Sequence, residues 1–454
     1  MTMITLPDQT PMGTINSKRN VTIITFSRLF DSNGTIMRKL LLTLCLLVAF
    51  SQVHAAYMLI PMDRQQKNHL KAYGLTYWVL TQNVEVSWLL NYRGGSFMFQ
   101  HHSILENEAR IRGISYEIIA DVQAASILNE IADPQSNMDE MKLQKAPRIA
   151  VYTPKSKLPW DDAVTLALTY AEVPYDIVYD EEVIGGSLPL YDWLHLHHED
   201  FTGQFGKFWA AYRTAQWYIE DVRATETMAQ RLGFSKVSDL KRAVAMKIRE
   251  FTAGGGYLFA MCSAPDSYDV ALAAEHIDIC DVMFDGDPFQ QDANDHLNYD
   301  NCFAFTDFSV VLNPYEYEIS NIDVSTTRRV SIADDFFTLF EFSAKWDPVP
   351  TMLTQNHEKV IKGFMGQTTA FNKDYIKPNV VIMGENKAAN EARYIHSSYG
   401  KGTWTFYGGH DPEDYQHLVG DPPTDLNLYP NSPGYRLILN NVLFPAAKKK
   451  KQKT

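Results

Sequence analysis

The chain has 454 residues, of which 45% are hydrophobic and 12% aromatic, and this is enough apolar material for more than one buried core. Its formal net charge of −13 at pH 7 excludes nucleic acid as a partner, because contacts to phosphates require clustered positive charge. No apolar run after residue 56 reaches the roughly 18 residues of a membrane-spanning helix, so no such helix is expected there. A small molecule, a peptide and a carbohydrate all stay open as the substrate.

Residues 37–55 have the layout of a secretory signal peptide: a basic start, Met-Arg-Lys, then a leucine-rich apolar run, then Val-His-Ala before the cleavage point. We therefore expect an exported, periplasmic protein whose mature chain starts at Ala56. Residues 1–36 precede this segment and show no sustained hydrophobic period. Two interpretations of them stay open, a stretch upstream of the true start and a disordered leader.

Residues 56–145 alternate short β-rich runs with helical patterns, which is typical of a small α/β lobe. Strands are expected at 57–62, 95–100 and 115–120, and helices at 63–82, 84–94 and 104–113. A polar stretch, DPQSNMDEMKLQK, then leads into the next buried run. We place a domain boundary there, near Lys145.

Residues 146–445 continue the alternation, and we expect a second, larger α/β domain. Strands are expected at 147–154, 175–180, 191–197, 257–261, 379–385 and 392–410, the last broken by a glycine turn, and helices at 160–174, 208–251 and 434–444. Strands that alternate with helices form mostly parallel sheets, so the sequence predicts a doubly wound, flavodoxin-like sheet. The basic tail, 446–454, is either a solvated end or a segment that contacts an anionic surface.

The apolar strand at 257–261 breaks off at Cys262, which has Ala260 and Ala264 two residues to either side. A strand-to-helix turn that projects a nucleophile needs small flanking residues, because the turn is tight. A helix that starts just after the cysteine would stabilise its thiolate, and the Ser263 N–H would help to bind an oxyanion. The alternative is a buried free cysteine that packs as a small apolar residue.

A second apolar strand ends in Gly408 and Gly409 and presents His410 at the carboxyl edge of the predicted sheet, where doubly wound folds place ligands. We expect this histidine to be the general base for Cys262. The acids available to orient it are Asp411, Glu413 and Asp414, which follow it along the chain.

The stretches GGGYLFAMCSAP and GKGTWTFYGGHDPED together resemble the class I glutamine amidotransferase-like superfamily, and the second is most similar to its trehalose-utilisation (ThuA-like) branch. The resemblance covers residues 146–445. It implies a flavodoxin-like sheet and a triad of Cys262, His410 and Glu413 that hydrolyses an amide of the glutamine type. The ThuA-like branch implies the alternative, a binding or scaffold protein without catalysis.

The whole mature chain also resembles exported bacterial proteins that are commonly labelled asparagine synthetase B. Asparagine synthetases use an amino-terminal cysteine to hydrolyse glutamine and an SGGxDS-type loop to bind ATP. This chain has neither feature, so its residues do not support that activity.

A histidine cluster lies in WLHLHHEDF, where His195 and His197 alternate with leucines and so share one face of a strand, and His198, Glu199 and Asp200 follow at its end. Imidazole and carboxylate groups suit Zn²⁺ or another divalent ion, and the candidate ligands are the three histidines. The alternative is a set of polar side chains lining a cleft. The cluster falls at the same predicted edge as the cysteine and His410, so we expect a single pocket there.

The cysteines that follow the signal peptide are Cys262, Cys280 and Cys302. An odd number in an exported chain leaves at least one unpaired. Cys280 and Cys302 could form a disulfide, which would leave Cys262 as the free thiol; the sequence leaves this pairing open.

Overall fold

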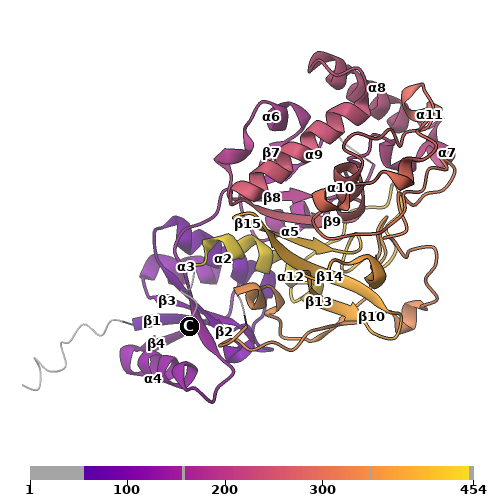
Figure 1. The fold of residues 1–454 in the computed structure, drawn as a ribbon. Coiled ribbons are helices and arrows are strands. Elements are labelled where there is room, and N and C mark those ends of the chain that lie inside the picture. The colour runs from indigo at the N-terminus through magenta and orange to yellow at the C-terminus, as the bar shows by residue number, and fades with distance from the viewer. Residues whose placement is uncertain (1–55, 156–158, 348, 449–454) are drawn as a thin grey trace, which may run out of the picture. The chain divides into compact units, whose positions relative to one another are not determined.

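Two β-sheets organise the part of the chain that the computed structural model describes, which is residues 56–155, 159–347 and 349–448 (Figure 1). The predicted leader, the predicted signal peptide and the basic tail beyond residue 448 lie outside these residues. Within them, no helix combines the length and the apolar character needed to cross a membrane.

The first sheet is antiparallel and has the strand order β4-β1-β3-β2-β5. Its strands are β1 (Ala56–Ile60), β2 (Val86–Leu90), β3 (Ser96–Gln100), β4 (Glu117–Ala120) and β5 (Asp139–Leu143), and its helices are α2 (His69–Thr81), α3 (Ser103–Ile111) and α4 (Asp121–Ala132). Side chains alternate across the sheet: Trp88 and Phe97 pack in the core that α2 and α3 share, whereas Leu89 and Met98 pack in the core under α4.

One expectation for this region is wrong, and one of its strands was not predicted. The segment expected to be a helix at 84–94 contains β2, and the polar stretch before Lys145 contains β5. All five residues of β2 are buried between neighbouring strands, so the segment lacks the alternation of apolar and polar residues that marks a half-buried strand.

The second sheet has ten strands among the described residues, in the order β11-β10-β13-β14-β15-β9-β8-β6-β7, with β12 paired to β14. The strands are β6 (Ile149–Tyr152), β7 (Asp176–Val178), β8 (Trp193–Leu196), β9 (Tyr257–Met261), β10 (Phe336–Leu339), β11 (Val360–Lys362), β12 (Phe371–Asn372), β13 (Val381–Asn386), β14 (Glu391–Tyr399) and β15 (Gly402–Tyr407). Strands β7, β6, β8, β9 and β15 are parallel, and the remainder are antiparallel. The α/β class is therefore confirmed with a mixed sheet, and the flavodoxin-like arrangement stays a prediction.

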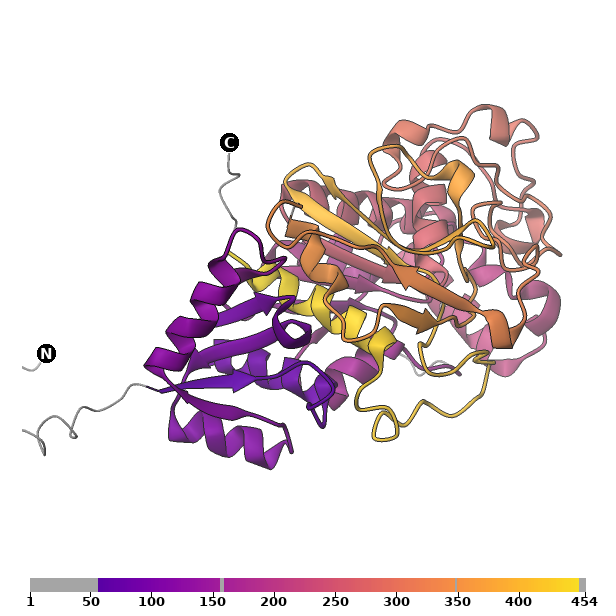
Figure 2. The same cartoon turned by 90° about the horizontal axis from the view of Figure 1, so that it is seen from below.

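The helices that follow the first sheet are α5 (Ala163–Tyr170), α6 (Asp180–Ile184), α7 (Trp209–Tyr212), α8 (Gln216–Arg231), α9 (Val237–Gly254), α10 (Ala264–Ala273), α11 (Val282–Asp285) and α12 (Pro433–Leu443). The long helical stretch expected at 208–251 consists of three helices, α7, α8 and α9. The carboxyl-terminal α12 packs against both α2 and α5 (Figure 2). The core that these three helices share reaches from Trp88 of the first sheet to Phe259 of the second.

The order of the parallel strands decides where the polar segments meet. Strands β8, β9 and β15 are neighbours and run in the same direction, so their carboxyl ends lie at one edge of the sheet. The residues that follow them are His197, Cys262 and Gly408. Three segments far apart in the sequence are thereby brought to one place.

Candidate functional site

Cys262 occupies the turn between β9 and α10 with a φ of 56°, in the left-handed region that non-glycine residues rarely adopt. Two main-chain hydrogen bonds hold the turn: the Cys262 N–H donates to the Gly409 carbonyl at 3.1 Å, and the Ala264 N–H donates to the His197 carbonyl at 3.0 Å. Ala260 and Ala264 are fully buried, which explains why the flanking positions need small residues. Nucleophile elbows have this strained strand-to-helix geometry.

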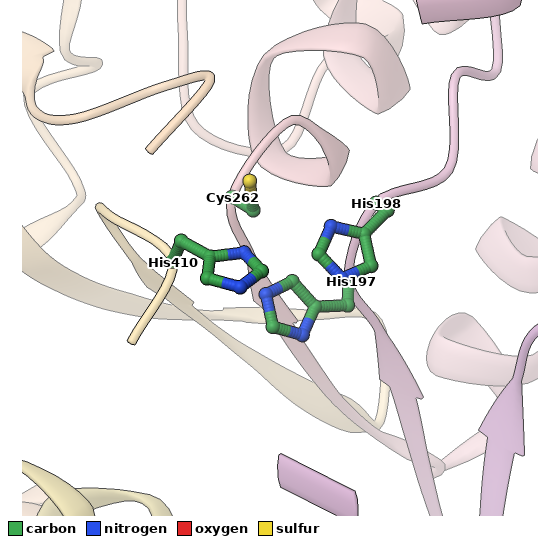
Figure 3. A group of neighbouring side chains, drawn as sticks. All are labelled: His197, His198, Cys262 and His410. Carbon is green, nitrogen blue, oxygen red and sulfur yellow. The ribbon is translucent and has the colours of Figure 1, made fainter. Parts of the chain in front are cut away.

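Three imidazoles converge on the Cys262 sulfur (Figure 3). His197 and His198 follow β8, and His410 follows β15. One nitrogen from each ring and the sulfur all lie within 4.8 Å of one another. The rings pack closely, with centroids 3.9 Å apart between His197 and His198 and 4.7 Å apart between His198 and His410. The two motifs that the sequence presented separately therefore form one site.

Asp162 contacts His195 of β8 and His197, which follows that strand. Its carboxylate caps α5, because Oδ1 accepts hydrogen bonds from the N–H groups of Val164 and Thr165 at 2.7 and 2.9 Å. The same carboxylate lies 3.1 Å from His197 Nδ1 and 3.2 Å from His195 Nε2. A fixed helix cap thus orients the ring that faces the sulfur.

Asp161, the neighbouring residue, serves the other two histidines. Its main-chain carbonyl contacts His198 Nε2 at 2.6 Å, and its Oδ1 lies 3.6 Å from His410 Nε2 and 2.9 Å from His417 Nε2. His417 also contacts Asp414 at 2.9 Å through Nδ1. Asp161 is therefore the carboxylate that the fold places beside His410.

The loop after β11 also approaches the sulfur. The Gln367 N–H points at Cys262 Sγ at 3.4 Å. Gly366 lies against the strand end that carries His410. A Cβ at this position would lie only 2.7 Å from the main-chain nitrogen of His410. The Ser263 hydroxyl is buried and has no hydrogen-bond partner among the described residues. One backbone donor of this loop thus points at the thiol.

The electrostatics favour a thiolate. Burial raises the pKa of Cys262, but contacts with His197, His198 and His410 outweigh it and hold the pKa well below its ordinary value. Burial also acts against a charged His197, yet Asp162 raises the pKa of that imidazole to about 10. Burial lowers the pKa of His198 to about 4. These directions favour a negative sulfur beside a cationic His197 and a neutral His198.

Glu413, the expected acid of the triad, does not take its hydrogen bond from His410. Its carboxyl group is bonded by Ser432, and burial raises its pKa. Asp411, another expected candidate, accepts from the Glu413 N–H at 2.8 Å and from the Tyr435 hydroxyl at 2.7 Å, so it folds the segment after the histidine. The acid beside His410 comes from a different part of the chain.

The other residues of the histidine motif have separate places. His195 is fully buried in the sheet, where Nδ1 lies 3.2 Å from the Phe259 carbonyl. Glu199 lies 3.7 Å from the ammonium of Lys241, and burial raises its pKa to about 8. Asp200 accepts hydrogen bonds from main-chain N–H groups of its own loop. Of the three histidines expected as metal ligands, His195 lies outside the group that surrounds the sulfur.

Four contributors were missed by the sequence analysis as site residues: Asp161, Asp162, Gln367 and His417. The two aspartates follow the strand expected at 147–154 and begin the next helix. That position placed them at the same sheet edge as the cysteine, so a signal was present. Gln367 and His417 come from irregular segments and had none.

Cys280 and Cys302 do not form the disulfide that the sequence left open, since all three described cysteines are free. Each of the two thiols contacts a main-chain carbonyl: Cys280 that of Thr202 at 3.3 Å, and Cys302 that of Asp269 at 3.2 Å. Burial raises both pKa values well above the ordinary value. They are structural thiols, in contrast to the one at the elbow.

A cavity of about 290 Å³ opens beside the sulfur. One wall is aromatic, with ring centroids 5.5 Å apart between Trp160 and Phe208 and 5.9 Å apart between Phe208 and Tyr317. The indole Nε1 of Trp160 and the Oε1 of Glu318 are buried in this wall without hydrogen-bond partners among the described residues. The cavity therefore combines an aromatic wall with polar side chains, as ligand pockets do.

No family model matches the chain, and no curated protein matches it. Among solved structures it is similar to two cytoplasmic proteins of Salmonella typhimurium, STM3548 (10% identity, 67% of this chain and 100% of that one, TM-score 0.33) and STM1381 (11%, 66% and 100%, 0.34). It is also similar to Gan42B, a GH42 β-galactosidase from G. stearothermophilus, at 9% identity over 59% of this chain and 28% of that one, with a TM-score of 0.25. Likeness at this level carries no argument about function.

Proposed function

We propose that this chain is a cysteine-dependent amide hydrolase in which Cys262 is the nucleophile. The observation that carries the proposal is the strained φ of 56° at a turn whose sulfur meets three imidazoles. A backbone strain of this kind costs on the order of 1–3 kcal/mol and persists at sites where it orients a reacting group. A cysteine that only filled space would not require it.

In the first half of the proposed reaction, the thiolate of Cys262 attacks the carbonyl carbon of the amide, and the carbonyl oxygen takes up the negative charge. The N–H groups of Gln367 and Ser263 are the proposed oxyanion donors, because one points at the sulfur and the other begins the segment that enters α10. His410 then gives a proton to the leaving nitrogen. The amine departs and a thioester remains.

In the second half, water attacks the thioester with His410 as the general base, and the acid product leaves while the thiolate is restored. Asp161 keeps His410 oriented, in the place that the amidotransferase-like resemblance assigned to Glu413. His197, held by Asp162, balances the charge of the sulfur. One water molecule is consumed for each amide cleaved.

The size of the cavity supports a small substrate. A volume of about 290 Å³ lies at the lower end of ligand pockets, which fits one amide-bearing side chain or a compact amide better than a folded protein segment. A primary amide of the glutamine type is therefore the proposed substrate class. The predicted signal peptide extends the proposal to an activity in the periplasm.

The test is alkylation of the folded protein by iodoacetamide at about pH 6.5, where an ordinary thiol with a pKa near 8.5 is only about 1% ionised. We expect Cys262 to react at least about tenfold faster than a small free thiol, and Cys280 and Cys302 to remain unmodified as internal controls. Peptide mass analysis assigns the adduct, and ammonia release from glutamine and other primary amides reports turnover. An unreactive Cys262 would contradict the proposal and favour the binding-protein alternative.

A further inference from the structure

The site contains more histidines than a nucleophile needs. One imidazole is enough to activate a cysteine, and here His197, His198 and His410 all place a nitrogen within 4.8 Å of the Cys262 sulfur and of one another. Three imidazoles and a thiolate are a complete donor set for a tetrahedral zinc ion. We propose that these four side chains bind Zn²⁺ and that the bound ion masks the nucleophile.

The ring nitrogens that face away from the sulfur lie beside oxygen atoms of two neighbouring aspartates. His197 Nδ1 lies 3.1 Å from the Asp162 carboxylate, His198 Nε2 contacts the Asp161 carbonyl at 2.6 Å, and His410 Nε2 lies 3.6 Å from the Asp161 carboxylate. Histidines that bind metals are characteristically tied through their second nitrogen to a carboxylate or carbonyl. The arrangement leaves His197 Nε2, His198 Nδ1 and His410 Nδ1 toward the sulfur, as Figure 3 shows.

One inner nitrogen, His197 Nε2, lacks a competing partner. His197 is only 2% exposed, and its buried Nε2 has no hydrogen-bond partner in the described part of the chain. A buried polar atom without a partner is costly, and a metal ion would satisfy it. This observation is independent of the spacing of the four side chains.

The distances allow a zinc ion with small movements. Bonds of about 2.0–2.1 Å to nitrogen and 2.3 Å to sulfur in a tetrahedron place the donor atoms roughly 3.3–3.7 Å apart. Because the four donor atoms lie within 4.8 Å of one another, the rings would need to move closer by at most roughly 1–1.5 Å. The nitrogen and sulfur donors favour Zn²⁺ over Mg²⁺ or Ca²⁺, which prefer oxygen ligands.

The number of ligands decides what the ion would do. Four protein ligands close a tetrahedral zinc site and leave no position for a reactive water, so the ion would not act as a catalyst. The zinc ion would instead bind the lone pair that the Cys262 sulfur uses to attack a substrate. This consequence rests on the proposed function: activity requires the metal-free site, and zinc would inhibit it reversibly.

The experiment uses the purified full chain after dialysis against a chelator, with Zn²⁺ titrated in competition with a chromophoric chelator. We expect one ion per chain, and no comparable binding of Mg²⁺. The variants His198→Asn and His410→Asn should each weaken Zn²⁺ by more than about 100-fold, since loss of an outer-shell partner alone typically costs 10- to 100-fold. The matched control is His296→Asn, because that histidine is 54% exposed and pairs only with Asp292.

Cobalt provides a second measurement that does not depend on activity. Co²⁺ in the wild-type site should show the intense visible absorption of tetrahedral, thiolate-bound cobalt, and Cys262→Ser should lose it. Circular dichroism of each variant separates loss of binding from loss of fold.

The outcomes separate the two proposals. Absence of stoichiometric Zn²⁺ binding in a protein whose Cys262 is alkylated rapidly would overturn the metal site alone. Zinc binding to a protein whose metal-free thiol stays inert would overturn the hydrolase alone. Binding that survives both histidine substitutions would show an adventitious surface ion and overturn the metal site.

Discussion

The main-chain N–H of Cys262 donates a hydrogen bond of 3.1 Å to the carbonyl of Gly409, the residue before His410. Because β9 and β15 are adjacent and parallel, this bond joins the two strand ends that carry the proposed nucleophile and its base. The separation of cysteine and histidine is therefore determined by the backbone and not by flexible side chains. Changes to the backbone near this bond should affect reactivity even where no side chain of the site is altered.

Gly366 provides the first such change. In Gly366→Ala the new Cβ would lie 2.7 Å from the main-chain nitrogen of His410, so the loop and the strand end must separate. We expect a loss of about 1–3 kcal/mol in the free energy of unfolding, as for other overpacked sites, and a slower alkylation of Cys262. Urea unfolding and the rate of alkylation measure the two effects.

The matched control for this change is Gly254→Ala at the end of α9. A Cβ there meets nothing within 4 Å, and the position is helical, so the substitution should be neutral or stabilise by up to about 1 kcal/mol. Equal effects of the two substitutions would show that the contact between the loop and His410 contributes neither to stability nor to the reactivity of Cys262.

The choice of acid for His410 can be tested with two substitutions of the same kind. Asp161→Asn removes the charge 3.6 Å from His410 Nε2, and we expect kcat to fall by about 10²-fold or more with a smaller change in KM. Glu413→Gln alters a carboxyl group that is bonded by Ser432, and kcat should stay within about twofold. Steady-state kinetics of ammonia release decide between them. The reverse order would assign the role to Glu413.

Trp160 is predicted to contribute to substrate binding through its unpartnered indole N–H. Trp160→Phe keeps an aromatic wall but removes the donor. A lost neutral hydrogen bond is worth about 0.5–1.5 kcal/mol, so KM should rise by about 3- to 10-fold with kcat little changed. The control is Trp346→Phe, at an indole that is 74% exposed. An unchanged KM for Trp160→Phe would mean that the substrate does not reach this wall.

The free thiols can be counted directly. In the mature chain starting at Ala56, the unreduced, unfolded protein should release three equivalents from a disulfide reagent, one each from Cys262, Cys280 and Cys302. In the folded protein only one should react quickly, because the other two are buried with raised pKa values. A count of one after unfolding would establish the disulfide that the structure lacks.

Stability should decrease in mild acid because of buried histidines. Burial lowers the pKa of His396 to about 3, and burial together with Arg436 lowers that of His69 to about 3. The unfolded chain binds these protons near pH 6.5 and the folded chain does not, so this stability is complete above about 6.5 and is lost as pH falls toward 3. Each such group adds a slope of about 1.4 kcal/mol per pH unit within that window.

The variant His396→Gln tests this slope, because glutamine keeps a hydrogen-bonding group for the Thr405 hydroxyl and does not titrate. Urea unfolding between about pH 6.5 and 4 should show a shallower pH dependence by roughly one proton. The exposed His276, replaced by glutamine, serves as the control and should leave the slope unchanged. Identical slopes in wild type and His396→Gln would contradict the prediction.

Local patterns in the sequence were sufficient for part of the site. The apolar run that stops at Cys262 between two alanines, and the one that stops at His410 after two glycines, each predicted a strand end, and β9 and β15 end there. The same reasoning failed at β2, whose five buried residues show no alternation. Alternation of apolar and polar residues arises when one face of a strand contacts solvent. A strand that is buried on both faces does not show it.

The sequence by itself determined the α/β class, the separate strand ends and the residue types available there. Only the tertiary structure decided that His197, His198 and His410 all lie beside the Cys262 sulfur. It also decided that Asp161 lies beside His410, whereas Glu413 is hydrogen-bonded by Ser432. The reason is that strand order and helix packing bring distant segments together, whereas patterns along the chain report only a residue's neighbours in sequence. The positive φ of the cysteine, which separates an elbow from a buried thiol, is likewise a consequence of that packing.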